Sequence, residues 1–142
     1  MARIKLQLPD RNHFITEIPV RIADINYGGH IGNDSVLSLM HEARVQFLHH
    51  FGYREQDVDG AGIIMVDAVI NYKAEGFYGM TLRFEVAVAE IESHGCDLYY
   101  RLSDVSTGKE IARAKTGLVF FDYETKKPMP TPDRFRDLFS LK

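Results

Sequence analysis

One long helical pattern, followed by four long strand patterns, most constrains how this 142-residue chain can fold. Between about residues 34 and 51 apolar side chains recur at helical spacing on a wide stripe, which predicts a helix largely enclosed by other structure. The stripe consists of Val36, Met40, Ala43, Phe47 and Phe51, widened by Leu37, Leu39 and Leu48. Gly52 suits the C-terminal end of this helix. Asn33, Asp34 or Ser35 can cap its start.

Five further segments carry the alternating or apolar patterns of β-strands. They span residues 14–22, 62–73, 81–92, 97–105 and 110–123. Pro19 lacks an N–H group, so the first strand is expected at a sheet edge or at a bulge. The turn at residues 106–109 is short enough to join the last two strands as an antiparallel hairpin. Thr131, as a cap followed by Pro132, predicts a short C-terminal helix.

The order of these elements favours an α+β fold. Short connections between consecutive strands favour an antiparallel sheet with a helix packed on one face. Five long strands and one long apolar helix suit a sheet that curves around that helix. No internal repeat or linker divides the chain, so residues 1–142 are expected to form a single domain.

Composition narrows the classes of function. A single cysteine, Cys96, excludes an internal disulfide framework and a cysteine-based zinc site. The formal net charge of -3 argues against a nucleic-acid partner. No apolar run approaches the roughly 18 residues that span a bilayer, and the N-terminal residues have no long apolar core typical of a signal peptide. We therefore expect a cytoplasmic protein without a membrane or metal requirement.

The segment between the first strand and the long helix carries the chemistry. Its sequence ADINYGGHIGN places Asp24, Asn26, His30 and Asn33 in a glycine-rich loop that runs into a helix start. The first N–H groups of a helix lack internal partners and carry partial positive charge, so they can polarise a carbonyl or hold an oxyanion. A nearby carboxylate can activate water or attack the carbonyl. The combination is typical of acyl transfer.

The motif D-x-N-x-x-x-H-x-x-N, followed by E-A-R and F-L in the helix, resembles the 4-hydroxybenzoyl-CoA thioesterase branch of the hotdog-fold superfamily. It is similar to the D-x-D-x-x-G-H-x-x-N pattern of acyl-CoA and acyl-carrier-protein thioesterases. INYKAEGFYGMTLRFEV resembles the family's Y-x-x-P-x-x-x-G-D stretch, although Ala74 and Met80 replace its Pro and Asp. STGKEIARAKTGLVFFDYETKKPMPTP resembles its closing hairpin and tail.

The resemblance implies a hotdog fold, in which a five-stranded antiparallel sheet wraps around a long central helix. It implies an acyl-CoA thioesterase that hydrolyses an acyl or aroyl thioester to a carboxylic acid and a free thiol. The thiol carrier would be coenzyme A or an acyl-carrier protein, with no cofactor beyond the coenzyme A of the substrate. It also implies a homodimer or homotetramer with the site between subunits.

The resemblance assigns roles to individual residues. Asp24 matches the catalytic aspartate, as nucleophile or general base, and His30 and Asn33 match the motif's His and Asn. Backbone N–H groups around Ile31, Gly32 and Asn33 would hold the thioester oxygen, with Gly29 and Asn26 beside the substrate. Asn26 stands where many members have a second Asp. Structural roles are the alternatives: a turn or cap for Asp24, a loop hydrogen bond for His30, a helix cap for Asn33 and an Asx turn for Asn26.

The sequence offers two further candidate carboxylates and two alternative functions. Glu42 on the helix and Asp67 in an apolar strand are possible second carboxylates, although a structural role is the alternative for both. A hotdog enoyl-CoA hydratase or dehydratase is the second hypothesis; its D-x-N-P-x-H motif differs here by the missing Pro and one extra residue. A non-catalytic acyl-CoA-binding domain is the third hypothesis.

Overall fold

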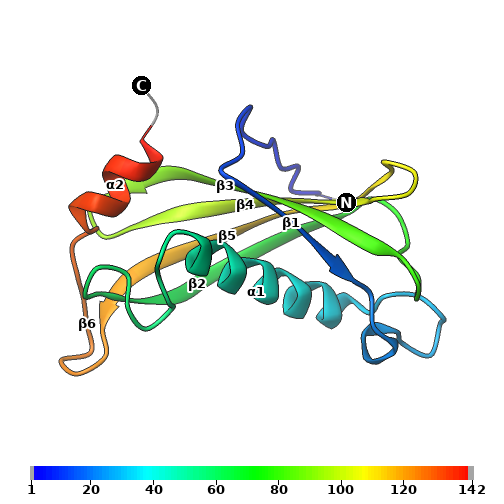
Figure 1. Ribbon diagram of the computed structural model, residues 1–142, viewed down its shortest axis with the longest axis horizontal. Coiled ribbons are helices and arrows are strands. Elements are labelled where there is room, and N and C mark those ends of the chain that lie inside the picture. Colours follow the sequence, from blue (N-terminus) through cyan, green and yellow to red (C-terminus); the bar gives the residue numbers. More distant parts are fainter. Residues whose placement is uncertain (1, 141–142) are drawn as a thin grey trace.

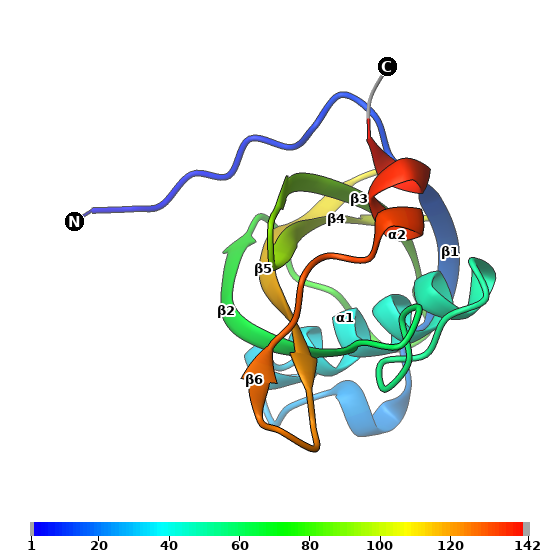
Figure 2. The same cartoon turned by 90° about the vertical axis from the view of Figure 1, so that its left-hand side faces the viewer.

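The computed structural model describes residues 2–140. The elements are β1 (Phe14–Pro19), η1 (Ile22–Asp24), α1 (Asn33–His50), β2 (Gly62–Tyr72), β3 (Thr81–Glu92), β4 (Gly95–Asp104), β5 (Glu110–Asp122), β6 (Lys127–Pro128) and α2 (Asp133–Phe139). The strands pair antiparallel in the order β1-β3-β4-β5-β2, and a short β6 pairs with β5. The sheet curves around the long helix α1, with α2 at one end (Figures 1 and 2). The predicted hotdog architecture is confirmed, with β6 as an additional two-residue strand.

The core lies between α1 and the concave face of the sheet. Alternate residues of β5 face α1, and this row includes Thr116, which is fully buried and hydrogen-bonded to the hydroxyl of Tyr100 at 2.9 Å. At one end, Phe135 and Phe139 of α2 close the core, and the Phe139 ring stacks 5.4 Å from the ring of Phe47 on α1. The predicted helix stripe is therefore the buried face of α1, apart from Leu37, which is 40% exposed, and Phe51, which caps the helix and is partly buried.

Three predictions about element ends are settled by the structure. β1 is an edge strand, as expected from Pro19. The expected side-chain cap of α1 is wrong: the N-cap is Gly32, which makes no side-chain cap hydrogen bond. The expected cap of α2 is wrong by one residue, because Pro132 is the N-cap and the Thr131 hydroxyl donates instead to the carbonyl of Glu92, 2.6 Å away.

The opposite edge of the sheet is β2. A bulge between Met65 and Asp67 shifts its register against β5. Residues 65–68 are exposed on this edge, including Met65 at 47% and Val66 at 58% of their full accessible surface. An extended edge with exposed apolar side chains is a surface that can pair with another chain.

Candidate active site

Asp24 is held inside the loop that connects β1 to α1. Its carboxylate is 2% exposed and accepts hydrogen bonds from the backbone N–H of Arg21 at 2.8 Å and from the Arg21 guanidinium at 3.0 and 3.3 Å. Burial raises the pKa of Asp24, but the hydrogen bonds and charge of Arg21 outweigh burial and leave that pKa below its usual value. The Asp24 carbonyl accepts the N–H of Gly32 at 3.0 Å, which ties the turn to the helix start.

Asn26 and Gly29 shape the tip of the same loop. The Asn26 side-chain oxygen accepts the N–H of Gly28 at 2.9 Å, which is an Asx turn. The Asn26 N–H donates to the carbonyl of His30 at 2.9 Å. Gly29 has φ of +85°, a conformation that a residue with a side chain rarely adopts. The loop therefore folds back so that Asn26 lies beside the helix start.

His30 joins this loop to the segment between β2 and β3. One ring nitrogen, Nδ1, lies 3.1 Å from the carbonyl of Ile31, and Nε2 lies 3.7 Å from the Glu75 carboxylate. The Ile31 N–H donates to the carbonyl of Gly76 at 2.8 Å. A Cβ at Gly76 would lie only 2.4 Å from the Ile31 Cδ1 atom, so any side chain there would force Ile31 to move. Glu75 is thus a neighbour of the site that sequence spacing did not indicate.

Three residues gather around the α carbon of Gly32 at the start of α1. A Cβ built there would lie 2.8 Å from a carboxylate oxygen of Asp34, 3.6 Å from the Asn26 Cβ atom and 3.8 Å from the Ser35 hydroxyl. The N–H groups of Ile31 and Gly32 are already donated to protein carbonyls. The first-turn N–H groups of residues 33–35, which have no helical acceptor, are the donors that this geometry leaves for a ligand.

Tyr72 at the end of β2 also reaches the helix start. Its hydroxyl donates to the carbonyl of Asn33 at 3.3 Å. Burial and the negative charge of Asp34 raise the pKa of Tyr72, which places its phenol close to that carboxylate. Asp34 was predicted only as a possible helix cap. Tyr72 was not predicted as a site residue, because only the fold brings the end of β2 to α1.

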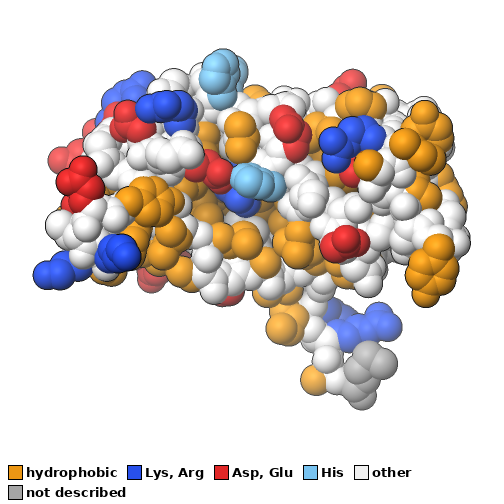
Figure 3. Space-filling model, turned by 90° about the horizontal axis from the view of Figure 1, so that it is seen from below, with side chains coloured by type: hydrophobic (Ala, Val, Ile, Leu, Met, Phe, Trp, Pro, Cys, Tyr) orange, Lys and Arg blue, Asp and Glu red, His pale blue; other side chains and the backbone are white. Residues whose placement is uncertain are grey.

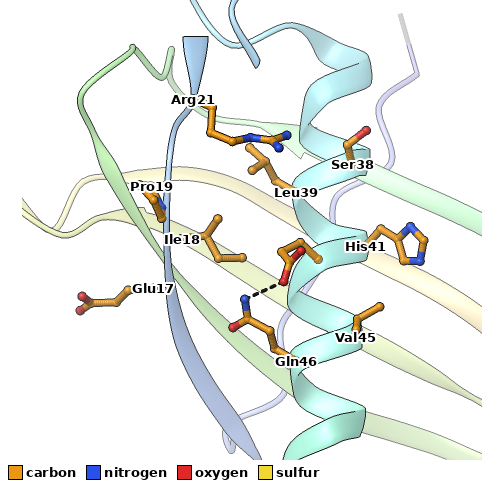
Figure 4. Close-up of a pocket in the computed structure, with 10 residues that line it drawn as sticks. Glu17, Ile18, Pro19, Arg21, Ser38, Leu39, His41, Val45 and Gln46 are labelled. Atoms are coloured by element: carbon orange, nitrogen blue, oxygen red, sulfur yellow. Dashed lines mark hydrogen bonds between the residues drawn. The ribbon is translucent and has the colours of Figure 1, made fainter. Parts of the chain in front are cut away.

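The two other predicted carboxylates occupy different places. Glu42 lies on the exposed side of α1, accepts a hydrogen bond from Gln46 at 2.8 Å, and lines with Arg21 a groove of about 390 Å³ between β1 and α1 (Figure 4). The negative charge of Glu42 contributes to raising the pKa of Arg21. Glu42 and Arg21 therefore line the same groove.

Asp67 points away from α1. It pairs with Gly117, whose neighbours along β5 face the helix, so the Asp67 side chain lies on the convex face. Its carboxylate binds the Lys115 ammonium at 2.9 and 3.0 Å and the N–H of Gly117 at 2.8 Å. Within one chain the structure gives Asp67 structural partners and does not bring it to the helix start.

A second groove, of about 240 Å³, runs between α1 and the β2 edge. Apolar side chains including Leu37, Met40 and Met65 line it, together with Arg44. The Arg44 side chain is 9% exposed and its Nε donates to Glu55 at 2.7 Å. This groove begins one turn beyond the helix start, so it can receive a group attached to a carbonyl bound there.

Within residues 2–140, no helix is both long and apolar enough to cross a membrane. No group of three or more His, Cys, Asp or Glu side chains in this range could hold a metal ion. The expectation that the reaction needs no cofactor stays a prediction.

Comparison with known proteins places this site in a family. The model of the thioesterase-like superfamily matches residues 20–139. The fold is similar to that of a 1,4-dihydroxy-2-naphthoyl-CoA thioesterase from Synechocystis, with 23% identity, 88% of this chain and 93% of that chain covered, and a TM-score of 0.80.

Two further solved structures are similar. A putative thioesterase from Pseudomonas aeruginosa has 21% identity, a TM-score of 0.80, and coverage of 87% of this chain and 95% of that one. The gentisyl-coenzyme A thioesterase BH1999 has 19% identity, a TM-score of 0.79, and coverage of 89% and 100%. No curated protein matches the chain in sequence. Since the family model covers most of its length, the chain belongs to the thioesterase-like superfamily.

Proposed function

We propose that the protein is an acyl-CoA thioesterase, which hydrolyses an acyl or aroyl thioester to a carboxylic acid and a free thiol. The observation that carries the proposal is the start of α1. There the first-turn N–H groups lie beside Gly32, Asn26 and Asp34 at the end of a loop pinned by Asp24. Membership of the thioesterase-like superfamily supports this reaction class.

In the proposed reaction, the thioester oxygen binds the N–H groups of residues 33–35. These groups and the partial positive charge of an 18-residue helix stabilise the negative charge that develops on the oxygen. The Asn26 side chain lies beside this position, and we assign His30, Asn26 and Asn33 the role of orienting the carbonyl or the attacking water. With Asp24 as base, water loses a proton to the Asp24 carboxylate and adds to the carbonyl carbon, which forms the tetrahedral intermediate. With Asp24 as nucleophile, the carboxylate itself adds, and water later cleaves the resulting mixed anhydride. The intermediate collapses and the C–S bond breaks; the thiolate takes its proton from Asp24 in the first case and from the water that goes on to cleave the anhydride in the second.

Asp24 is the proposed base or nucleophile, but in this structure its carboxylate is covered by Arg21. Its carboxylate is shielded by Arg21, so it can reach water only when that guanidinium moves. The Arg21 side chain is 66% exposed, and Glu42 across the groove offers it another partner. We therefore propose that Glu42 takes part by receiving Arg21, while Asp24 acts on the substrate.

The groove between α1 and β2 is the proposed place for the acyl group. Its apolar walls suit an acyl chain or an aromatic ring. Two of the similar solved structures are named as coenzyme A thioesterases, one for 1,4-dihydroxy-2-naphthoyl-CoA and one for gentisyl-CoA. We propose a coenzyme A thioester as the substrate of this chain, with an acyl-carrier-protein thioester as the other form to be tested.

We further propose a homodimer formed along β2. Pairing of two β2 edges would cover the exposed Met65 and Val66 and would close the open side of the α1–β2 groove. A homotetramer would need a second contact between such dimers. In the β2 dimer the site would lie between subunits. The cytoplasmic location stays a prediction.

The testing experiment is thiol release from a panel of acyl-CoA, aroyl-CoA and acyl-carrier-protein thioesters. A thioesterase releases thiol and acid together. A hydratase consumes the conjugated double bond of an enoyl-CoA without releasing thiol. A binding domain retains acyl-CoA in equilibrium dialysis and does neither. Release at no more than the rate of the buffer blank, for every substrate, contradicts the proposal.

A further inference from the structure

The groove between α1 and β2 follows the helix towards a buried arginine. Its lining on α1 begins at Leu37 and ends at Arg44, and the fully buried Thr116 of β5 forms part of its inner wall. Figure 3 views the molecule from the α1 side and shows hydrophobic side chains at the surface among charged ones. Leu37 and Met65 of the groove are 40% and 47% exposed. A largely apolar groove therefore ends at a cation on the side away from the helix start.

Arg44 is only 8% exposed, and a buried guanidinium costs free energy unless acceptors meet its N–H bonds. Glu55 accepts the Nε hydrogen at 2.7 Å and is the ion-pair partner of Arg44 within residues 2–140. The other carboxylate oxygen of Glu55 lies 2.8 Å from Nε2 of His41. A guanidinium has more N–H bonds than this one carboxylate oxygen can accept. The two terminal nitrogens of Arg44 therefore need other acceptors.

The guanidinium shares the end of the groove with two buried hydroxyls. Thr116 lines the groove together with Arg44, and its hydroxyl is hydrogen-bonded to that of Tyr100 at 2.9 Å. Burial raises the pKa of Tyr100, and the positive charge of Arg44 opposes this rise, as expected for a guanidinium beside the phenol. No fully buried side-chain nitrogen or oxygen in residues 2–140 lacks a hydrogen-bond partner. The N–H bonds that neither Glu55 nor Tyr100 accepts therefore open on the groove.

Arg44 lies within reach of an acyl group whose carbonyl is bound at the helix start. The helix rises about 15 Å from Asp34 in the first turn to Arg44. Helical side chains lean towards the N-terminus of their helix, so the guanidinium lies nearer, roughly 10 Å from the first-turn N–H groups. With carbon–carbon bonds of about 1.5 Å, an extended acyl chain of roughly six to eight carbons covers this distance. The far end of such a chain meets Arg44.

We propose that Arg44 selects acyl groups that carry a neutral oxygen acceptor, a hydroxyl or a carbonyl, at the far end of the chain. The inference rests on the proposed thioesterase function, with the acyl group in this groove, and it names the substrate class. A neutral oxygen suits the site because Glu55 already balances the charge of Arg44. An unsubstituted chain of the same length would exclude water from these N–H bonds and offer them no acceptor.

The test compares kcat/KM for thiol release from matched pairs of coenzyme A thioesters. Each pair consists of an unsubstituted chain and a chain of the same length with a hydroxyl on its last carbon, in a series from butanoyl to decanoyl. We expect the wild type to prefer the hydroxylated member by about tenfold or more near the hexanoyl to octanoyl lengths, because a buried charged donor without its acceptor is costly. The butanoyl pair, whose hydroxyl does not reach Arg44, should show no such preference.

Two variants separate a contact with the substrate from the ion pair with Glu55. Glu55→Gln breaks the ion pair and keeps the guanidinium, whereas Arg44→Met with Glu55→Gln removes both charges and leaves no unpaired buried carboxylate. We expect the single variant to keep the preference for the hydroxylated chain and the double variant to lose it. Arg134→Lys is the matched control, because Arg134 on α2 also pairs with a carboxylate, that of Asp59 at 3.5 Å, and it should keep the preference. The preference is a ratio within one preparation, so a smaller folded fraction does not change it.

The outcomes separate this inference from the proposed function. Equal loss of the preference in the single and double variants shows that Arg44 acts only through its ion pair, and overturns the inference. A preference that persists in the double variant also overturns it, as does a wild type with no preference at any chain length, and both results leave thioester hydrolysis in place. Absence of thiol release from every chain overturns the proposed function, and with it the selectivity.

Discussion

Replacing Gly32 by alanine tests the proposed oxyanion site with little cost to the fold. The backbone at Gly32 has φ of -69° and ψ of 153°, which alanine adopts without strain. The new methyl carbon would lie 2.8 Å from the Asp34 carboxylate oxygen, and no backbone atom is among the three nearest atoms. The Asp34 side chain can rotate to relieve this contact, so the methyl group itself stays at the helix start.

The two effects on stability oppose each other. Alanine is a poorer N-cap than glycine by about 0.5–1 kcal/mol. Alanine also restricts the unfolded chain, which stabilises the fold by about 0.4–1 kcal/mol. The free energy of unfolding should therefore change by less than about 1 kcal/mol, and Tm by only a few degrees.

Activity should change far more than stability. The methyl group crowds the first-turn N–H groups, and loss of one oxyanion donor costs about 10²–10³ in kcat. The assay is kcat/KM for thiol release alongside thermal unfolding, with Gly52→Ala as an alanine control at the other end of α1. Gly52 has φ of +83°, so that control should lose stability and keep its kcat/KM while folded. A folded Gly32→Ala enzyme with kcat/KM within twofold of wild type would refute the oxyanion site.

Four other predictions concern the loop and the core. Asp24→Asn should lower kcat by about 10²–10⁴. Arg21→Ala should keep its activity but shift the acid limb of the pH–activity profile to higher pH, because Arg21 lowers the pKa of Asp24. Equal losses of activity in both variants would indicate that the pair is structural. Since that pKa is lowered in the folded state, wild type should also lose stability as the pH falls below about 4, and Asp24→Asn should lose less in acid unfolding. Gly76→Ala should destabilise by about 1–3 kcal/mol in denaturant unfolding, because its Cβ overlaps Ile31, and an unchanged midpoint would contradict the tight contact between the loops. Burial raises the pKa of Cys96 to about 12, so a thiol reagent at pH 8 should modify it only in urea, and rapid modification of the native protein would show that the thiol is accessible.

The fold follows closely from sequence periodicity, because alternation along a strand and spacing along a helix directly report which face is buried. The long helix and five strands lie where the apolar patterns placed them, and β3 matches its predicted bounds. The helix starts were less well predicted. Gly32 caps α1 although three neighbouring polar residues are better formers of caps in isolation. The tertiary contacts of the loop set where the helix begins, and the capping preferences of single residues do not include such contacts.

The candidate site was predicted only in part. The motif located the loop and the helix start, but it did not show which hydrogen bonds their polar groups make. Arg21 lies three residues before Asp24, and this spacing alone could have suggested an ion pair across the 3-10 turn. Glu75 and Tyr72 carry no such local signal, because the sheet brings the end of β2 and the segment after it to the helix start.

The most direct test of the account is the product balance of the wild-type enzyme with a coenzyme A thioester. Free thiol is measured with a thiol reagent, and the acid is measured by mass spectrometry of the same samples. The account predicts one acid for each thiol over many turnovers. Acyl-CoA that binds and is recovered intact, or an enoyl-CoA that gains water with no thiol released, would contradict thioester hydrolysis at the start of α1.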